Sequence, residues 1–203
     1  MEVAPDRLER WLSGFRDRHG DLAVRPEPQR LTLVAADGTV AHLHPPPGTT
    51  AGTDLDGFLA AAREPRRIGL LLARQAALAV GVARGGELEA SKVDSWYVQG
   101  RTAAGGWSQQ RFARRRGNQA AAAAGKAAGV AARVLVPAAD RLAALVTGGD
   151  RRTVEAILAD PRVAALLPLR SARHLAVATP NLAVLRAAVP AARAVEIHLP
   201  IPT

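Results

Sequence analysis

An alanine-rich basic stretch between residues 95 and 136 limits most strongly how this chain can fold. Alanine is the best helix former, so the run predicts one long helix. Ser108 is a favourable N-cap residue, which would put Gln109 in the first helical turn. Gly105 and Gly106 come just before it, and glycine adopts backbone angles that other residues avoid. The stretch is therefore predicted to be a glycine loop followed by a helix that ends near residue 132.

The same stretch is strongly basic. Between Asp94 and Asp140 there is no acidic residue, although an exposed helix commonly pairs its basic side chains with Glu or Asp three or four positions away. The basic residues of this interval are Arg101, Arg111, Arg114, Arg115, Arg116, Lys126 and Arg133. A basic interval beside a glycine turn favours contact with a polyphosphate backbone, and an ordinary solvated helix is the simpler alternative.

Helical periodicity assigns faces to this helix. At 100° per residue, one sector would hold Arg111, Arg114, Arg115 and Asn118. A neighbouring sector, which we expect to face the core, would hold Phe112, Ala123, Ala127 and Val130. The partial positive charge at a helix N-terminus would add to the attraction for an anion.

Residues 105–119, GGWSQQRFARRRGNQ, resemble the catalytic loop and following helix of the class-1 peptide release factors of eukaryotes and archaea. In those proteins a Gly-Gly-Gln loop precedes an Arg-Phe-x-Arg-x-Arg helix. The insertion between Gly-Gly and Gln is more similar to the Vms-like release factor (VLRF) family of ribosome quality control. The chain is identified as a stand-alone member of that family, of the actinobacterial kind. The resemblance covers roughly residues 69–167, and its specificity lies in residues 100–118.

This resemblance implies a peptidyl-tRNA hydrolase that frees nascent chains on stalled, split ribosomes without reading a codon. It implies a catalytic loop made by Gly105, Gly106, Ser108 and Gln109. It implies RNA binding by Arg101, Arg111, Arg114, Arg115, Arg116, Asn118 and Lys126. Either the ester bond or the tRNA 3′ end could be cleaved, and Gln110 is the alternative to Gln109. A non-catalytic RNA- or ribosome-binding module and a general ribonuclease are the competing interpretations.

A glutamine amide cannot act as a general base, but it can orient a nucleophile and stabilise an oxyanion by hydrogen bonding. The sequence offers no better catalytic set, since it has no Ser-His-Asp arrangement, no carboxylate pair near the loop and no Walker-type phosphate loop. Asp94, the acid nearest the loop, is interpreted as structural. His42 and His44 lack a third ligand nearby and there is no cysteine, so we expect no metal and no cofactor.

The order of elements predicts an α/β fold with a mixed sheet and flanking helices. Three strands should follow one another between residues 68 and 99, with Gly85-Gly86 closing a hairpin. The resemblance implies that this domain is the ribonuclease-H-like catalytic domain of a release factor. We expect a division into an N-terminal helix and β-hairpin extension, residues 1–64, and a catalytic domain, residues 65–203.

The 203 residues carry a net charge of +9 and are 48% hydrophobic, which fits a globular protein with an anionic partner. The expected partners are peptidyl-tRNA and the large ribosomal subunit, with no codon-reading domain in a chain of this length. The N-terminus has no apolar signal region, and no continuous apolar run approaches the ~20 residues that span a bilayer. We expect a cytoplasmic monomer that does not bind a membrane.

Overall fold

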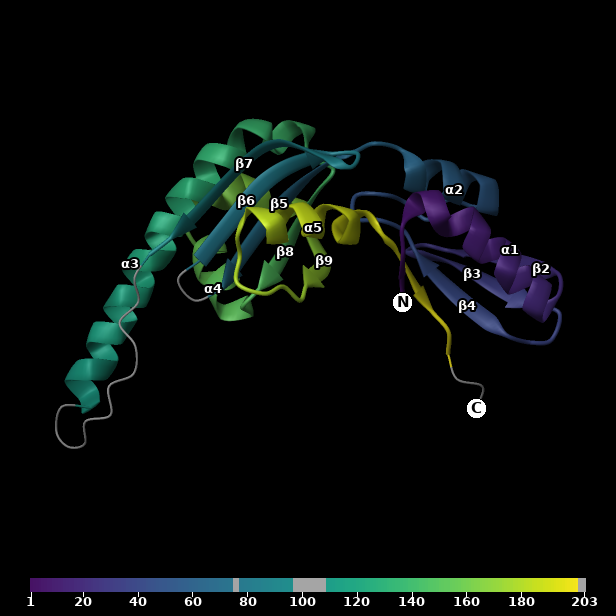
Figure 1. Ribbon diagram of the computed structural model, residues 1–203, viewed down its shortest axis with the longest axis horizontal. Helices are drawn as coiled ribbons and strands as arrows, with labels where there is room; N and C mark the ends of the chain where they lie inside the picture. The colour runs from purple at the N-terminus through teal and green to yellow at the C-terminus, as the bar shows by residue number, and fades with distance from the viewer. Residues whose placement is uncertain (75–76, 97–108, 201–203) are drawn as a thin grey trace.

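The computed structural model describes residues 1–74, 77–96 and 109–200, and for residues 109–118 it describes the backbone alone. The chain forms two five-stranded sheets, each with helices packed on it (Figure 1). We call the sheet that holds the N-terminal strands the N-sheet and the other the main sheet. This arrangement is the mixed α/β class that the sequence predicts.

The N-sheet is antiparallel, with the strand order β1-β10-β4-β3-β2. Its strands are β1 (Glu2–Val3), β2 (Leu22–Glu27), β3 (Arg30–Ala35), β4 (Val40–His44) and β10 (Val195–His198). Strands β3 and β4 form the β-hairpin expected within residues 1–64, and Asp37 and Gly38 lie in its turn. Gly38 has a φ of 86°, and a carboxylate oxygen of Asp37 accepts a hydrogen bond from the Thr39 N–H at 2.8 Å.

Two helices cover one face of the N-sheet. A 3-10 turn, η1 (Pro5–Arg7), leads into α1 (Leu8–His19), which ends at the predicted Gly20 with a φ of 84°. Leu8, Leu12 and Phe15 are buried at helical spacing against the sheet. Helix α2 (Leu55–Arg63) begins at Asp54, whose side chain accepts a hydrogen bond from the Gly57 N–H. Helix α1 is the N-terminal helix that the sequence predicts.

The main sheet has the strand order β7-β6-β5-β8-β9. Its strands are β5 (Arg67–Arg74), β6 (Ala77–Arg84), β7 (Glu87–Ser95), β8 (Ala144–Gly149) and β9 (Arg170–Leu175). The first three form the predicted antiparallel meander, and β8 and β9 join it in parallel. Numbered along the chain, the order is 3-2-1-4-5.

Helices cover both faces of the main sheet. One face carries α3 (Gln109–Leu135), α4 (Arg151–Leu158) and the 3-10 segments η2 (Val136–Arg141) and η3 (Pro161–Leu169). The other face carries α5 (Leu182–Arg193). Burial on both faces explains why β5 and β6 are almost continuously apolar.

Some boundaries differ from the prediction. The sequence predicts that the long helix ends near residue 132. Instead, α3 continues to Leu135, and η2 follows with Pro137 near its start. The β-branched residues Val134 and Val136 suggested a strand, but packing of the helix against the sheet overrides that local preference.

The last strand, β10, pairs with β1 and β4 of the N-sheet rather than with the main sheet. The chain therefore crosses from the N-sheet to the main sheet after α2 and returns to the N-sheet at Val195. A division near residue 64 separates the strands of the two sheets except for β10. The independence of two such units stays a prediction.

One helical stretch, Gln119–Arg141, has the length and apolar composition of a helix that could cross a membrane. Of its most apolar part, 39% is buried within the protein. The buried residues of this stretch, which include Ala127, Ala131 and Leu135, belong to the core against the main sheet. A core helix of a globular protein has these same properties.

Candidate functional site

The predicted loop and the start of α3 form the candidate site. Arg101, Gly105, Gly106 and Ser108 lie outside the described residues. Helix α3 begins at Gln109, so Gln109 and Gln110 occupy its first turn, as predicted. The side chains of Arg111, Arg114, Arg115, Arg116 and Asn118 also lie outside the description, and their roles stay predictions.

The C-terminal half of α3 fixes the helix to the main sheet. Its small side chains let the helix approach the sheet closely, and the most buried residues are Ala127, Ala128, Ala131 and Leu135. Of the predicted core face, Ala127 and Val130 are buried and Ala123 is half-buried, while the side chain of Phe112 is not described. The buried face is therefore rotated from the predicted one toward Ala124, Ala128 and Ala131.

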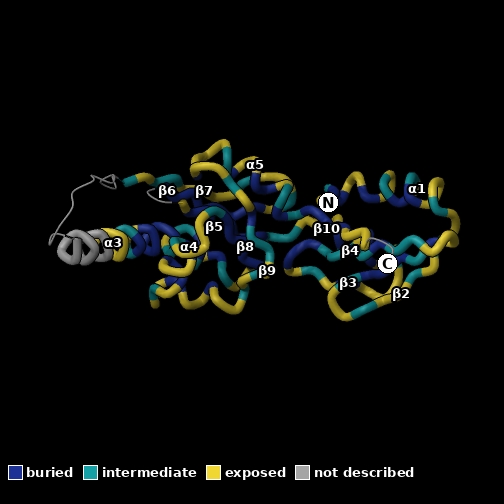
Figure 2. Tube along the Cα trace, turned by 90° about the horizontal axis from the view of Figure 1, so that it is seen from below, coloured by how far each residue is buried: buried dark blue, intermediate teal, exposed yellow. Residues whose placement is uncertain are grey.

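The N-terminal half of α3 leaves the body of the protein. Residues 119–122 are all exposed, and burial begins at Ala124 (Figure 2). Figure 1 shows the helix projecting past the main sheet. With a rise of about 1.5 Å per residue, the start of α3 at Gln109 lies about 22 Å along the helix axis from Ala124. We call residues 109–123 the α3 arm.

Two basic residues of α3 have described side chains. Lys126 and Arg133 are exposed, and neither forms an ion pair with a carboxylate in the described part of the chain. They are seven residues apart, about two helical turns, and therefore face nearly the same way. Uncompensated positive charge thus continues from the base of the arm along the body of the protein.

A contact that the sequence analysis missed fixes the base of the arm. The guanidinium of Arg162 in η3 donates a hydrogen bond to the backbone oxygen of Gly125, with an N–O distance of 2.6 Å. The same guanidinium bonds both carboxylate oxygens of Asp160 at 2.8 and 2.7 Å. These bonds and the Arg162 N–H lower the pKa of Asp160 to about 2. The available sequence signal is the glycine spacing at 125 and 129 inside an alanine run, which marks a close approach.

The strand that leads to the loop ends in a packing contact. Trp96 follows β7 and packs, partly buried, against the core under α3. The next residue, Tyr97, lies outside the described residues. A carboxylate oxygen of Asp94 accepts a hydrogen bond from the Ser95 N–H at 2.9 Å. This contact agrees with a structural role for Asp94.

The predicted histidine pair makes protein contacts of its own. A ring nitrogen of His42 is 2.9 Å from the Thr32 hydroxyl. The ring of His44 lies 4.9 Å from that of His198, centroid to centroid, and burial lowers the pKa of His44, with His198 adding to the effect. Within the described part of the chain, no three His, Asp or Glu side chains are grouped to hold a metal ion.

The model of a protein family described as "Actinobacteria/chloroflexi VLRF1 release factor" matches residues 66–198. Curated proteins give no match. The crystal structure of the archaeal translation termination factor aRF1 is similar with a TM-score of 0.45 and 18% identity, over 89% of this chain and 52% of that one. A second structure, described as an archaeal protein, has a TM-score of 0.41 and 17% identity, over 90% and 53%. The chain spans about half the length of these two structures.

Proposed function

Because the chain belongs to the actinobacterial and chloroflexal VLRF1 release factor family, we propose that it releases nascent chains from peptidyl-tRNA on stalled large ribosomal subunits in the cytoplasm. The family establishes a release-factor type of role. The substrate, the bond that is cleaved and the residues that act are our proposal. It includes no step of codon recognition.

The observation that carries the proposal is the position of Gln109 at the start of an arm. Helix α3 begins at Gln109 and is packed on the protein only from Ala124 onward. A reactive group at the end of such a helix could enter a narrow site in a large particle while the body stays outside. The family match spans this whole segment, from the strands before the loop to the end of α3.

In this proposal the Gln109 side chain orients the attacking oxygen and stabilises the developing oxyanion, because a neutral amide can donate and accept hydrogen bonds but cannot take a proton. Gly105, Gly106 and Ser108 let the chain pass close to the tRNA end. The nucleophile is either water, which would cleave the ester, or a ribose hydroxyl, which would cleave the tRNA near its 3′ end.

The basic residues would position the RNA. Arg101, Arg111, Arg114, Arg115 and Arg116 would bind phosphate oxygens, with Asn118 donating hydrogen bonds beside them. Lys126 is exposed and has no described ion-pair partner, which supports the same role nearer the body. Such contacts supply affinity and orientation, and the chemical step depends on Gln109.

The test is release of a labelled nascent chain from purified stalled large subunits. Wild type should release the chain, Gln109→Ala should not, and Gln110→Ala serves as the matched control because it removes the adjacent amide. Mapping the tRNA 3′ end in the same reaction separates ester hydrolysis from nucleolytic cleavage. If neither wild type nor Gln109→Ala releases the chain while both bind the subunit, the protein is a binding module. Cleavage of free RNA by wild type would instead identify a general ribonuclease.

A further inference from the structure

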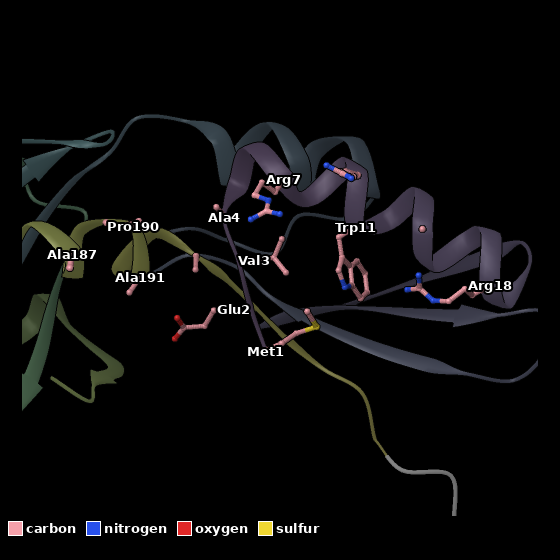
Figure 3. A pocket seen from close by; sticks show the side chains of 13 residues that line it. Met1, Glu2, Val3, Ala4, Arg7, Trp11, Arg18, Ala187, Pro190 and Ala191 are labelled. Carbon is pink, nitrogen blue, oxygen red and sulfur yellow. The ribbon is translucent and has the colours of Figure 1, made fainter.

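A groove of about 620 Å³ lies between α1, the β1 edge of the N-sheet and the C-terminal half of α5 (Figure 3). No described side chain of the α3 arm lines it. Its lining includes Arg7, Arg10, Trp11 and Arg18, with Glu2 on β1 and Ala187 on α5. The groove thus joins a basic helix flank to the seam between the two sheets.

The sequence of α1 explains this flank. Leu8, Leu12 and Phe15 turn toward the N-sheet core, and 100° per residue places Trp11 and Arg18 on the side next to them. Gly14 leaves the middle of the flank without a side chain. A Cβ at this position would lie 3.3 Å from the Arg18 guanidinium, so glycine gives Arg18 room to lie along the helix.

The groove is positively charged. Arg7, Arg10 and Arg18 are exposed, and none of them forms an ion pair with a carboxylate among the described residues. Glu2 is the one acidic residue in the lining. From Arg7 to Arg18 the helix rises about 16 Å. A row of guanidinium groups of this length suits an extended polyanion better than a single small ion.

Trp11 adds an aromatic surface to this row. Its ring stacks on Phe15 with a centroid distance of 5.0 Å and an interplanar angle of 13°, which holds it in place. The ring is only partly buried and lines the groove. Arginines that track a backbone, beside an aromatic ring that contacts bases, are the usual components of a single-stranded RNA site.

We propose that this groove binds a single-stranded RNA segment, with phosphates on Arg7, Arg10 and Arg18 and a base against Trp11. The inference deepens the proposed function and rests on it for the origin of the RNA, which would be ribosomal RNA or tRNA. An acidic protein segment is disfavoured because β1 has only two residues, too few to template an added strand. The RNA contact lies on a different part of the protein from the α3 arm.

The test compares two double variants that change the net charge equally. Arg7→Glu/Arg18→Glu alters the groove, while Arg16→Glu/Arg25→Glu alters exposed arginines that do not line it. Binding of the full chain to a labelled single-stranded oligonucleotide is measured by fluorescence anisotropy over a range of salt. The groove variant should bind at least tenfold more weakly, with a salt slope shallower by about 1.4, since each lost phosphate contact removes about 0.7. Thermal unfolding of each variant checks that the fold is intact.

Two further measurements locate the contact. Trp11→Leu should weaken binding at every salt concentration without changing the slope, because base stacking releases no counterions. The chain has no cysteine, so Ala187→Cys introduces a single thiol that can carry a photocrosslinker in the groove. It should crosslink to the oligonucleotide, whereas Ser91→Cys on β7 should not.

Several outcomes would overturn the proposal. Equal weakening by both double variants would indicate general electrostatic attraction. Unchanged RNA binding, with loss of binding to a polyglutamate peptide by the groove variant alone, would assign the groove to an acidic protein. The release assay is separate. If wild type releases nascent chains and the groove variant binds RNA as well as wild type does, only the groove proposal fails. If the groove variant alone loses RNA binding but wild type releases no nascent chain, only the proposed function fails.

Discussion

The guanidinium of Arg162 donates a hydrogen bond to the main-chain oxygen of Gly125, at 2.6 Å, where α3 leaves the main sheet. Asp160 holds the same guanidinium from the other side through two hydrogen bonds. Because Gly125 is one residue from Ala124, the first buried position of the helix, this contact ties the base of the arm to η3. The direction of the arm therefore depends on a residue of a different element.

Arg162→Ala should loosen the base of the arm. We expect faster amide hydrogen exchange in residues 123–130, because the carbonyl of Gly125 loses its partner and η3 loses its link to α3. Arg152→Ala, on the exposed surface of α4, is the control and should leave this exchange unchanged. Exchange followed by mass spectrometry measures both. Equal protection in Arg162→Ala and wild type would mean that the sheet contacts alone hold the arm.

The two glycines at this contact should respond differently to alanine. Replacing a helical glycine by alanine stabilises a helix by roughly 0.5–1 kcal/mol. At Gly125 the added Cβ would lie 3.9 Å from Arg162, an ordinary contact, so Gly125→Ala should raise the free energy of unfolding by that amount.

At Gly129 the Cβ would lie 3.0 Å from an Arg162 nitrogen, which must then move away from its partners. Gly129→Ala should therefore stabilise less than Gly125→Ala. In the Arg162→Ala background, Gly129→Ala should stabilise the protein as much as Gly125→Ala does. A double-mutant cycle of urea unfolding measures this coupling. Identical effects of the two glycine substitutions in the wild-type background would contradict this account.

Among the described glycines, an added Cβ would make its closest contact at Gly149. It ends β8 with a φ of 94°, and a Cβ there would lie 2.2 Å from the Ala73 oxygen. Gly149→Ala should cost about 3 kcal/mol or more, since left-handed strain of about 1–2 kcal/mol adds to displacement of β5. Gly38→Ala is the control. Its φ is 86° but nothing lies within 4 Å, so it should cost only the backbone strain in the same unfolding experiment.

Acid should destabilise the protein through two carboxylates, Asp37 and Asp160, whose pKa values are lowered in the folded state. A hydrogen bond from the Thr39 N–H, with a smaller contribution from a hydrogen bond to His19, lowers the pKa of Asp37 from 3.8 to about 2. Arg162 lowers the pKa of Asp160 over the same interval. A carboxyl whose pKa is lower in the folded state stabilises the fold above the unfolded value, and this contribution is lost as the pH falls from about 4 to about 2.

Urea unfolding between pH 7 and pH 2 measures this loss. Asp37→Asn and Asp160→Asn should each flatten the dependence of the free energy of unfolding on pH below 4. Arg162→Ala should flatten it as Asp160→Asn does, because it removes the main cause of the lowered pKa. A pH dependence that is steeper in the asparagine variants than in wild type would reverse the sign of the argument.

Local signals in the sequence were sufficient for most single elements. Helix α4 follows Asp150, whose side chain caps it, and Pro161 comes soon after its end. Strands β5 and β6 are apolar on both faces, which predicts their burial between two helix layers. The start of α3 at Gln109 also agrees with the sequence, in which helix-forming alanines follow this position.

Pairing between distant segments could not be predicted. Alternation identifies β10 as a strand but does not say that Val195 pairs with Val3 in the N-sheet. Strand β2 was missed because it contains Pro26, which interrupts the pattern, and it is tolerated because β2 is an edge strand. The contact of Arg162 with Gly125 could not be predicted for the same reason, because it depends on where η3 packs against α3.

Arg173 offers a test of how the two sheets depend on each other. Its side chain is only 6% exposed and pairs with Glu196 of β10 at 2.8 Å. It also donates to the backbone oxygens of Ala191, Ala192 and Ala194 at the end of α5. A single residue of β9 in the main sheet thus holds the segment through which the chain returns to the N-sheet.

Arg173→Ala should lower the free energy of unfolding by about 2–4 kcal/mol, because the Glu196 carboxylate and three backbone oxygens lose the hydrogen bonds that Arg173 donates. Arg186→Ala, exposed on α5, is the matched control and should change it little. Hydrogen exchange in increasing urea separates the two sheets. If the two sheets are separate units that Arg173 couples, peptides from β4 and β10 of the N-sheet should lose protection at lower urea than those from β5 in Arg173→Ala, and together with them in wild type. Loss of protection in all strands at one urea concentration in both proteins would make the two sheets a single cooperative unit that Arg173 does not join.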